Sequence, residues 1–265
     1  MKIGIIGMGK MGEAVAQGLA RSGVDATIRG ATRTAESATD VCERLGIPCG
    51  TENIEAARGA DIVLLGVKPH QAEHVVRGLS EAFTPDQVLL SICASITTAQ
   101  LAEWSGGVPT IIRAMPNTPC LIGEGMTVFS AGAGARRDQL EAAERLFGPL
   151  GRTAVVEESL MDGVTGLSGC GPAYVYLIIE ALSEAGVKIG LPRETATLLA
   201  AQTLAGASRM VLERGVHPAA LKDEVTTPAG CTIDGLMALE DGKLRVTLIK
   251  GVLAATERSR SLRGA

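Results

Sequence analysis

The order of apolar and polar positions divides the chain into two parts with different predicted secondary structure. In the first part, short apolar runs rich in β-branched residues alternate with segments in which apolar residues recur at helical period. Such alternation predicts strands joined by helical crossovers, and therefore an α/β fold with a parallel sheet. We expect the strands to lie within residues 2–6, 26–30, 60–70, 87–97 and 110–125.

From about Ser159 onward the strand pattern stops and helical periodicity remains. Helices are expected at 172–190, 193–215 and 217–225, and twice more after residue 233. A helical domain this small and this apolar has surplus apolar surface, so we expect a second copy of the chain to cover it. The pattern thus predicts a sheet domain over residues 1–158 and an all-helical dimerisation domain over residues 159–265.

A glycine-rich turn follows the first expected strand. Gly7, Gly9 and Gly12 have the G-x-G-x-x-G spacing, and a helical segment that ends at Ser22-Gly23 comes next. In this context the glycines permit a tight turn, let a pyrophosphate approach the backbone and let helix and strand pack closely. The alternative is an ordinary glycine turn. We expect a Rossmann-type domain whose cofactor contacts include the whole turn: Gly7, Met8, Gly9, Lys10, Met11 and Gly12.

The segment IRGATRTAES, after the second expected strand, bears on the choice of cofactor. NAD enzymes usually place Asp or Glu there, about 20 residues past the glycines, to hold the ribose 2′-hydroxyl. This chain has no acid at that place, whereas Thr32 and Arg33 offer groups that suit a 2′-phosphate. We therefore expect NADPH, with NADH as a second possible cofactor. The alternative is that Arg33 merely lies on a solvated loop.

Ligands of parallel α/β sheets bind at the carboxyl ends of the strands. The residues that follow the later strands are therefore candidate contacts, although each one taken singly is explained equally well as a turn residue. The expected cofactor contacts outside the glycine turn are Thr32, Arg33, Asn53, Val67, Lys68, Pro69, Cys93, Ala94, Ser95 and Asn117, with Met115 and Pro116 as further candidates.

Composition narrows the classes of partner. Of the 265 residues only 2% are aromatic and the formal net charge is −4, which argues against nucleic acid because few aromatics are available for stacking and the chain is acidic overall. No apolar run is long enough for a membrane span, and the first residues do not resemble a signal peptide. Six scattered cysteines indicate free thiols in a reducing cytoplasm, and the three histidines do not cluster with them, so we expect no metal site.

The stretch DEVTTPAGCTIDGL, residues 223–236, interrupts the helical part of the chain. Pro228 stops one helix, and Thr232 is placed to cap the next. Backbone N–H groups left free at that helix start, beside a hydroxyl, would form a seat for an anion such as a small carboxylate. The alternative is a capped turn between two helices.

Five segments of the chain are distinctive: IGIIGMGKMGEA at the start, VKPH at 67–70, RAMPNTP at 113–119, VTGLSGCGPAYVYLIIEAL at 164–182 and HPAALKDEVTTPAGCTIDGL at 217–236. The last two are the most specific. Together these segments resemble the pyrroline-5-carboxylate reductase family over nearly the whole chain. Ala229 and Ser95 stand where the family commonly has Gly, and Cys170 stands where many members have Ser.

The resemblance implies hydride transfer from the nicotinamide cofactor to the C=N bond of 1-pyrroline-5-carboxylate, which gives L-proline in the last step of proline biosynthesis. It implies that the substrate carboxylate lies on the N–H groups of Gly230, Cys231 and Thr232, and that the Thr232 hydroxyl, the candidate catalytic group, bonds the ring nitrogen. It also implies a homodimer whose two chains build each active site, and further assembly of dimers into rings, commonly decamers.

Two other functions stay open at this point. A β-hydroxyacid dehydrogenase shares the N-terminal fold, but that group carries a lysine and an asparagine where this chain has Val175 and Ile178. Without the lysine, an alcohol has no base to take its proton. A non-catalytic NADP-binding regulator or scaffold would have no need for the anion seat at TPAGCT.

Overall fold

The computed structural model describes residues 1–262, which form two compact units. One unit comprises residues 1–170 and 254–262, and the other comprises residues 171–253. This grouping differs from the division at residue 158 that the sequence pattern suggested, because the short helical segments after residue 158 and the last turns of the final helix pack with the sheet. A division of function at residue 158 stays a prediction.

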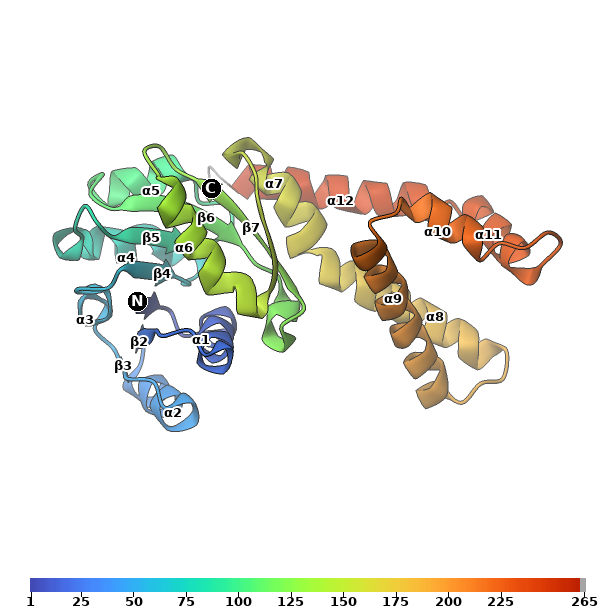
Figure 1. Ribbon diagram of the computed structural model, residues 1–265, viewed down its shortest axis with the longest axis horizontal. Coiled ribbons are helices and arrows are strands. Elements are labelled where there is room, and N and C mark those ends of the chain that lie inside the picture. Colours follow the sequence, from blue (N-terminus) through green and yellow to red (C-terminus); the bar gives the residue numbers. More distant parts are fainter. Residues whose placement is uncertain (263–265) are drawn as a thin grey trace. The chain divides into compact units, whose positions relative to one another are not determined.

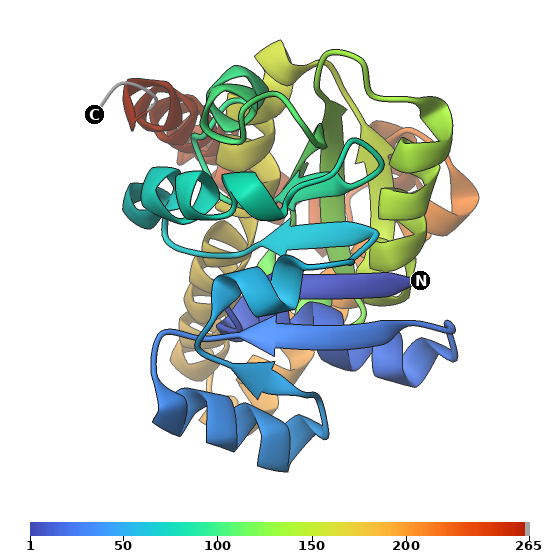
Figure 2. The same ribbon diagram turned by 90° about the vertical axis from the view of Figure 1, so that its left-hand side faces the viewer.

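The first unit is built on an eight-stranded sheet with the order β3-β2-β1-β4-β5-β6-β7-β8 (Figures 1 and 2). From β3 to β6 all neighbouring strands pair in parallel, as the sequence pattern predicted. The strands are β1 (Lys2–Ile6), β2 (Thr27–Ala31), β3 (Cys49–Gly50), β4 (Ile62–Leu65), β5 (Val88–Ser91), β6 (Thr110–Met115), β7 (Gly125–Ala131) and β8 (Gly151–Val155).

The last two strands run opposite to the other six, which the prediction of a parallel sheet missed. Strand β7 pairs antiparallel with β6, and β8 pairs parallel with β7. The connection from Met115 to Gly125 holds only a short 3-10 helix (Thr118–Ile122), whereas a parallel crossover needs about a dozen residues or more. The chain therefore turns back directly beside β6.

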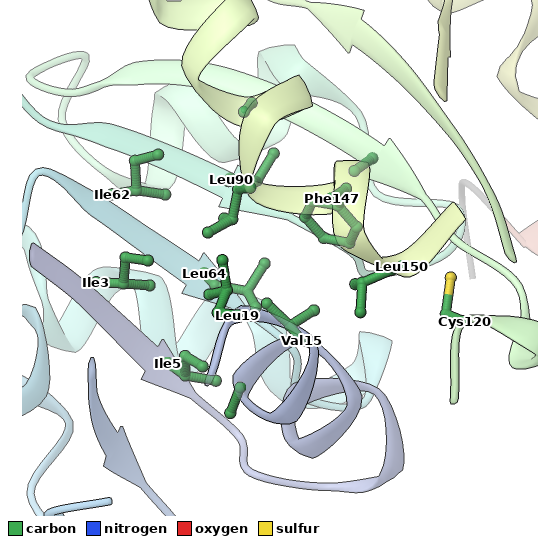
Figure 3. Close-up of a cluster of buried hydrophobic side chains, with 14 of the residues drawn as sticks. Ile3, Ile5, Val15, Leu19, Ile62, Leu64, Leu90, Cys120, Phe147 and Leu150 are labelled. Carbon is green, nitrogen blue, oxygen red and sulfur yellow. The ribbon is translucent and has the colours of Figure 1, made fainter. Parts of the chain in front are cut away.

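Helices cover both faces of this sheet. On one face, Val15 and Leu19 of the first helix meet Leu146 and Phe147 of the sixth in a buried core (Figure 3). On the other face, helices after β4 and β5 bury a second core that includes Trp104. The helices of this unit are α1 (Lys10–Ser22), α2 (Ala35–Leu45), α3 (Asn53–Ala57), α4 (Pro69–Gly78), α5 (Thr98–Trp104), α6 (Arg137–Phe147) and α7 (Met161–Val164), with 3-10 turns at Ser80–Ala82, Gly148–Leu150 and Glu158–Leu160 and a π-helical turn at Thr165–Gly169.

The second unit is helical and has almost no core of its own. Its buried residues are small: Ser183, Gly186, Ala196 and Ala200. A Cβ on Gly186 would lie 2.7 Å from the Cβ of Ala196, so the two helices approach closely there. Large apolar side chains remain exposed, among them Leu177 (65%). Such a surface is typical of a protein interface and agrees with the expected dimer. The helices are α8 (Gly171–Lys188), α9 (Arg193–Arg214), α10 (Pro218–Glu224), α11 (Cys231–Asp241) and α12 (Leu244–Ser261), whose last turns belong to the first unit.

Neither a membrane span nor a metal site is found in the described part of the chain. No helix within residues 1–262 combines the length and the apolar composition that crossing a bilayer needs. The same residues hold no cluster of three His, Cys, Asp or Glu side chains that could bind a metal ion.

Candidate functional site

The glycine turn joins β1 to α1, and its three glycines meet different steric demands. Gly7 has a φ of +94°, and a Cβ there would lie 2.9 Å from the backbone of Gly66. A Cβ on Gly12 would come within 2.5 Å of the Gly7 carbonyl oxygen, so a bare Gly12 lets α1 pack onto the turn. A Cβ on Gly9 would meet nothing within 4 Å. Gly9 therefore borders open space in which a ligand can approach the backbone.

The start of α1 presents backbone donors to that space. The N–H groups of Gly7 and Met8 donate to the Ala31 carbonyl at 2.9 and 3.2 Å. Those of Gly9, Lys10 and Met11 have no hydrogen-bond partner within residues 1–262. Free N–H groups together with the positive end of the helix dipole bind phosphate groups well.

A cavity of about 1020 Å³ opens beside this turn, at the carboxyl ends of β1, β2, β4 and β5. It brings together most of the cofactor contacts expected from the sequence. Three cationic side chains line it, and none of the described lining residues is Asp or Glu, which suits a ligand with several phosphates. The expected residues among the lining are Gly7, Gly9, Lys10, Met11, Thr32, Arg33, Asn53, Val67, Lys68, Pro69, Cys93 and Ala94, with Met115 and Pro116 also present.

Four expected contacts do not line this cavity. Met8 is 6% exposed and packs in the core against Gly30, and Gly12 faces the turn itself. Ser95 is buried, and its hydroxyl donates to the Ser259 carbonyl at 3.3 Å. The Asn117 amide is used for structure: its oxygen accepts from the Met126 N–H at 2.9 Å, and its nitrogen donates to Ser168.

The cavity also has lining residues that were not predicted as cofactor contacts. Thr51 follows β3, a strand of two residues that is too short to show in the hydrophobic pattern. Four others come from the first two turns of α4, where spacing alone does not say which helix face looks toward a ligand. The unpredicted lining residues are Ala31, Thr51, Gly66, His70, Gln71, His74, Val75, Ile92 and Thr118.

Cys93 lies at the base of the cavity as an uncharged thiol. Its sulfur donates to the Val67 carbonyl at 3.2 Å and to the Leu65 carbonyl at 3.6 Å. Burial raises its pKa to about 11, although hydrogen bonds with Ser91 and Val67 oppose that rise. At neutral pH the thiol therefore ties the ends of β4 and β5 together and is not a nucleophile.

The expected anion seat, in the second unit, differs in detail from its prediction. The cap of α11 is Gly230 with no side-chain cap, and Thr232 is the second helical residue, so Thr232 does not cap the helix. The Gly230 N–H already donates to the Thr227 carbonyl at 3.1 Å. Within residues 1–262 the N–H groups of Cys231 and Thr232 have no hydrogen-bond partner. These two N–H groups are therefore open to an anion.

Two departures from the family's glycine pattern fall on strained backbone. Ser95 has a φ of 63° and Ala229 a φ of 55°, both in the left-handed region that favours glycine. A residue with a Cβ costs roughly 1 kcal/mol there. Ser95 gains a hydrogen bond to Ser259, whereas nothing in the structure explains Ala229.

Comparison with known proteins agrees with the fold and the turn. Residues 158–262 match the family model described as pyrroline-5-carboxylate reductase dimerisation. Residues 2–95 match that of the coenzyme F420-dependent NADP oxidoreductases. A pyrroline-5-carboxylate reductase of Arabidopsis thaliana is 43% identical over 98% of this chain and 95% of its own length.

Solved structures give the same result over almost the full length. A pyrroline-5-carboxylate reductase from Coxiella burnetii superposes with a TM-score of 0.92 at 35% identity, covering 98% of this chain and 97% of that one. A Plasmodium falciparum pyrroline carboxylate reductase with NADP bound gives a TM-score of 0.87 at 33% identity, covering 99% and 98%. This chain belongs to the pyrroline-5-carboxylate reductase family.

Proposed function

We propose that this chain reduces the C=N bond of 1-pyrroline-5-carboxylate with NADPH and so produces L-proline, the last step of proline biosynthesis. The observation that carries the proposal is the full-length match at 43% identity to a pyrroline-5-carboxylate reductase. The glycine turn beside a carboxylate-free cavity supports it. Val175 and Ile178 on α8 leave no lysine base where a β-hydroxyacid dehydrogenase has one.

The cavity residues fit a dinucleotide with a 2′-phosphate. The N–H groups of Gly9, Lys10 and Met11 would hold the pyrophosphate, and Thr32 and Arg33 the 2′-phosphate. The relative from Plasmodium falciparum has NADP bound, which supports the same cofactor here. NADH has no 2′-phosphate to pair with Arg33, so we propose that it binds more weakly than NADPH.

The seat at the start of α11 would hold the substrate. Its carboxylate would accept from the N–H groups of Cys231 and Thr232. The turn before them needs glycine at position 230, because a Cβ there would lie 2.4 Å from the Thr227 hydroxyl. The Thr232 hydroxyl would bond the ring nitrogen. The bound cofactor supplies the hydride. Because a protonated imine is already electrophilic, the residues contribute mainly alignment, with the reacting carbons held about 3–3.5 Å apart.

The exposed apolar surface supports a homodimer, and the resemblance to the family implies larger rings. The exposed apolar side chains of α8, α9 and α12 would be covered by a second copy of the chain. By the family resemblance, five such dimers would form a decamer. Free cysteines suit a reducing cytoplasm. A net charge of −4 argues against nucleic acid or a membrane surface as a partner.

Parallel assays with each cofactor and two imines test the reaction. We expect the purified protein to oxidise NADPH with 1-pyrroline-5-carboxylate, to do so more slowly with NADH, and to prefer the five-membered imine to its six-membered homologue. The absorbance of the reduced nicotinamide reports each rate. Protein that binds NADPH but reduces neither imine would instead be a non-catalytic regulator or scaffold.

Thr232→Ala tests the role of the hydroxyl. We expect turnover to fall about tenfold to a hundredfold, because one hydrogen bond to a charged group is lost, while the affinity for NADPH stays unchanged. Thr39→Ala is a matched control, since Thr39 lies exposed on α2 and its hydroxyl bonds only the Ala35 carbonyl. An equal loss of NADPH affinity and turnover in the Thr232 variant would contradict its assigned role.

A further inference from the structure

Two of the free cysteines lie together at one edge of the sheet. Cys42 is in the last turns of α2, and Cys49 is in β3, the outermost strand (Figure 2). Both are partly exposed. They are separated by the turn at Gly46, which ends α2 in the left-handed conformation and brings the chain back beside the helix.

The sulfur of Cys42 lies directly against the backbone of Cys49. It accepts a hydrogen bond from the Cys49 N–H at 3.2 Å, and the Cys42 S–H donates to the Cys49 carbonyl oxygen at 3.5 Å. Disulfides join residues whose Cα atoms are about 4.4–6.8 Å apart. Because the Cys42 sulfur already lies beside the main chain of Cys49, we infer that the two residues are close enough for such a bond once the Cys49 sulfur turns toward α2.

The two thiols differ in their surroundings. Burial raises the pKa of Cys49 and the Cys42 sulfur raises it further, whereas a hydrogen bond with Thr32 lowers it. Cys42 makes hydrogen bonds to the backbone of Cys49. Because burial makes the thiolate of Cys49 harder to form, we assign Cys42 as the thiol that attacks an external disulfide and Cys49 as the thiol that completes the exchange.

The pair is connected to the cofactor cavity through Thr32. The Thr32 hydroxyl contacts the Cys49 thiol and donates to the Thr34 carbonyl at 3.0 Å, while its N–H donates to the Gly50 carbonyl at 2.9 Å. Thr32 lines the cavity, and so do Thr51 and Asn53, which directly follow β3. Turning the Cys49 sulfur toward α2 would remove one of the contacts of Thr32.

We propose that Cys42 and Cys49 form a reversible disulfide that weakens the binding of NADPH at its 2′-phosphate. The inference rests on the proposed use of Thr32 and Arg33 for that phosphate. With a small-molecule disulfide as oxidant, the Cys42 thiolate attacks one of its sulfurs and releases one thiolate. Cys49 then attacks the Cys42 sulfur and releases the second. Two protein thiols are oxidised, and one external disulfide is reduced to two thiols.

Oxidation of the whole protein by glutathione disulfide tests the proposal. We expect peptide mapping to find a Cys42–Cys49 crosslink, and the Kd for NADPH to rise about tenfold, as for one lost contact to a charged group. The Kd for NADH, which has no 2′-phosphate, should stay unchanged. Reduction with dithiothreitol should restore the affinity for NADPH to its value before oxidation. Nicotinamide fluorescence measures binding directly. Oxidation of other thiols that changes only the turnover rate therefore does not affect this measurement.

Serine variants make the result specific. Cys42→Ser and Cys49→Ser should each abolish the response, whereas Cys170→Ser should keep it, because Cys170 ends the π-helical turn at Thr165–Gly169 and lies on a different element from either thiol of the pair. Full oxidation without this crosslink, or a crosslink that leaves the NADPH affinity unchanged, would overturn the proposal. Reduced protein that fails to reduce the imine, but still loses NADPH on oxidation, would overturn the proposed reaction and leave the switch standing.

Discussion

Gly9→Ala is expected to abolish most NADPH binding while leaving the fold intact. The backbone of Gly9 has a φ of −89° and a ψ of −169°, which alanine adopts without strain, and its added Cβ would meet no protein atom within 4 Å. That Cβ would occupy the space in which a pyrophosphate reaches the free N–H groups of α1. Losing one or two charge-assisted hydrogen bonds should raise the Kd for NADPH about a hundredfold.

The measurement is a fluorescence titration with NADPH beside a thermal unfolding curve without it. Gly78→Ala is the matched control, because Gly78 is exposed at the end of α4, lies outside the cavity lining and also has room for a Cβ. Both variants should unfold near the temperature of the unaltered protein. Normal NADPH affinity in the Gly9 variant would show that the pyrophosphate does not bind at this turn.

The glycine turn was predictable because spacing and context both act locally. The G-x-G-x-x-G run follows a buried strand and begins a helix, and the structure has α1 start at Lys10 and end at Ser22 before a left-handed Gly23. Likewise Gly7 and Gly12 have the steric roles that the motif assigns to them. Where a few neighbouring residues fix the geometry, the sequence alone sufficed.

Features set by distant contacts were not predictable in the same way. The direction of β7 depends on how soon the chain pairs again after β6, and an apolar run looks alike in either direction. Asn117 follows a strand end, as a ligand contact would, but its amide is taken by Met126 and Ser168, the latter about fifty residues away in sequence. Pattern reasoning places a residue at an edge and does not show what its side chain meets.

The seat at α11 illustrates a subtler failure. Threonine caps helices well, and Thr232 follows a proline and small residues, so a cap there was a reasonable expectation. The helix instead begins two residues earlier than that cap allows, because Gly230 takes the cap position after its N–H closes a turn onto Thr227. As a consequence the Thr232 hydroxyl is not used as the helix cap, which is what the proposed role in substrate binding needs.

The second large effect is expected at a buried ion pair: Glu158→Ala should lower the free energy of unfolding by about 3–5 kcal/mol, because it leaves a buried charge without its partner. Glu158 accepts from the Arg113 guanidinium at 2.8 Å, and the Arg113 side chain is only 4% exposed. The same carboxylate accepts from the N–H and the hydroxyl of Thr98 at 2.7 and 2.6 Å. It therefore ties β6, the start of α5 and the segment before α7 together.

Urea unfolding at one fixed protein concentration measures the change, since a dimer's stability depends on concentration. Glu141→Ala is the control, because its partner Arg137 is 91% exposed and an ion pair of this kind contributes little. We expect no measurable change for that variant. Equal stability of the two variants would show that Arg113 finds water or another partner when Glu158 is gone.

The pH dependence of stability gives the same pair a second signature. Burial acts to raise the pKa of Glu158, but hydrogen bonds from Thr98 and Arg113 outweigh it, and the pKa is lowered from the ordinary value of 4.5. A carboxyl group with a lowered folded-state pKa stabilises the protein above its unfolded value and loses that contribution as the pH falls. The difference in stability between the unaltered protein and Glu158→Gln should therefore be constant near neutral pH and shrink below about pH 4.5. If the difference in the free energy of unfolding stayed the same below pH 4.5, the contribution of Glu158 to stability would come from its packing and not from its charge.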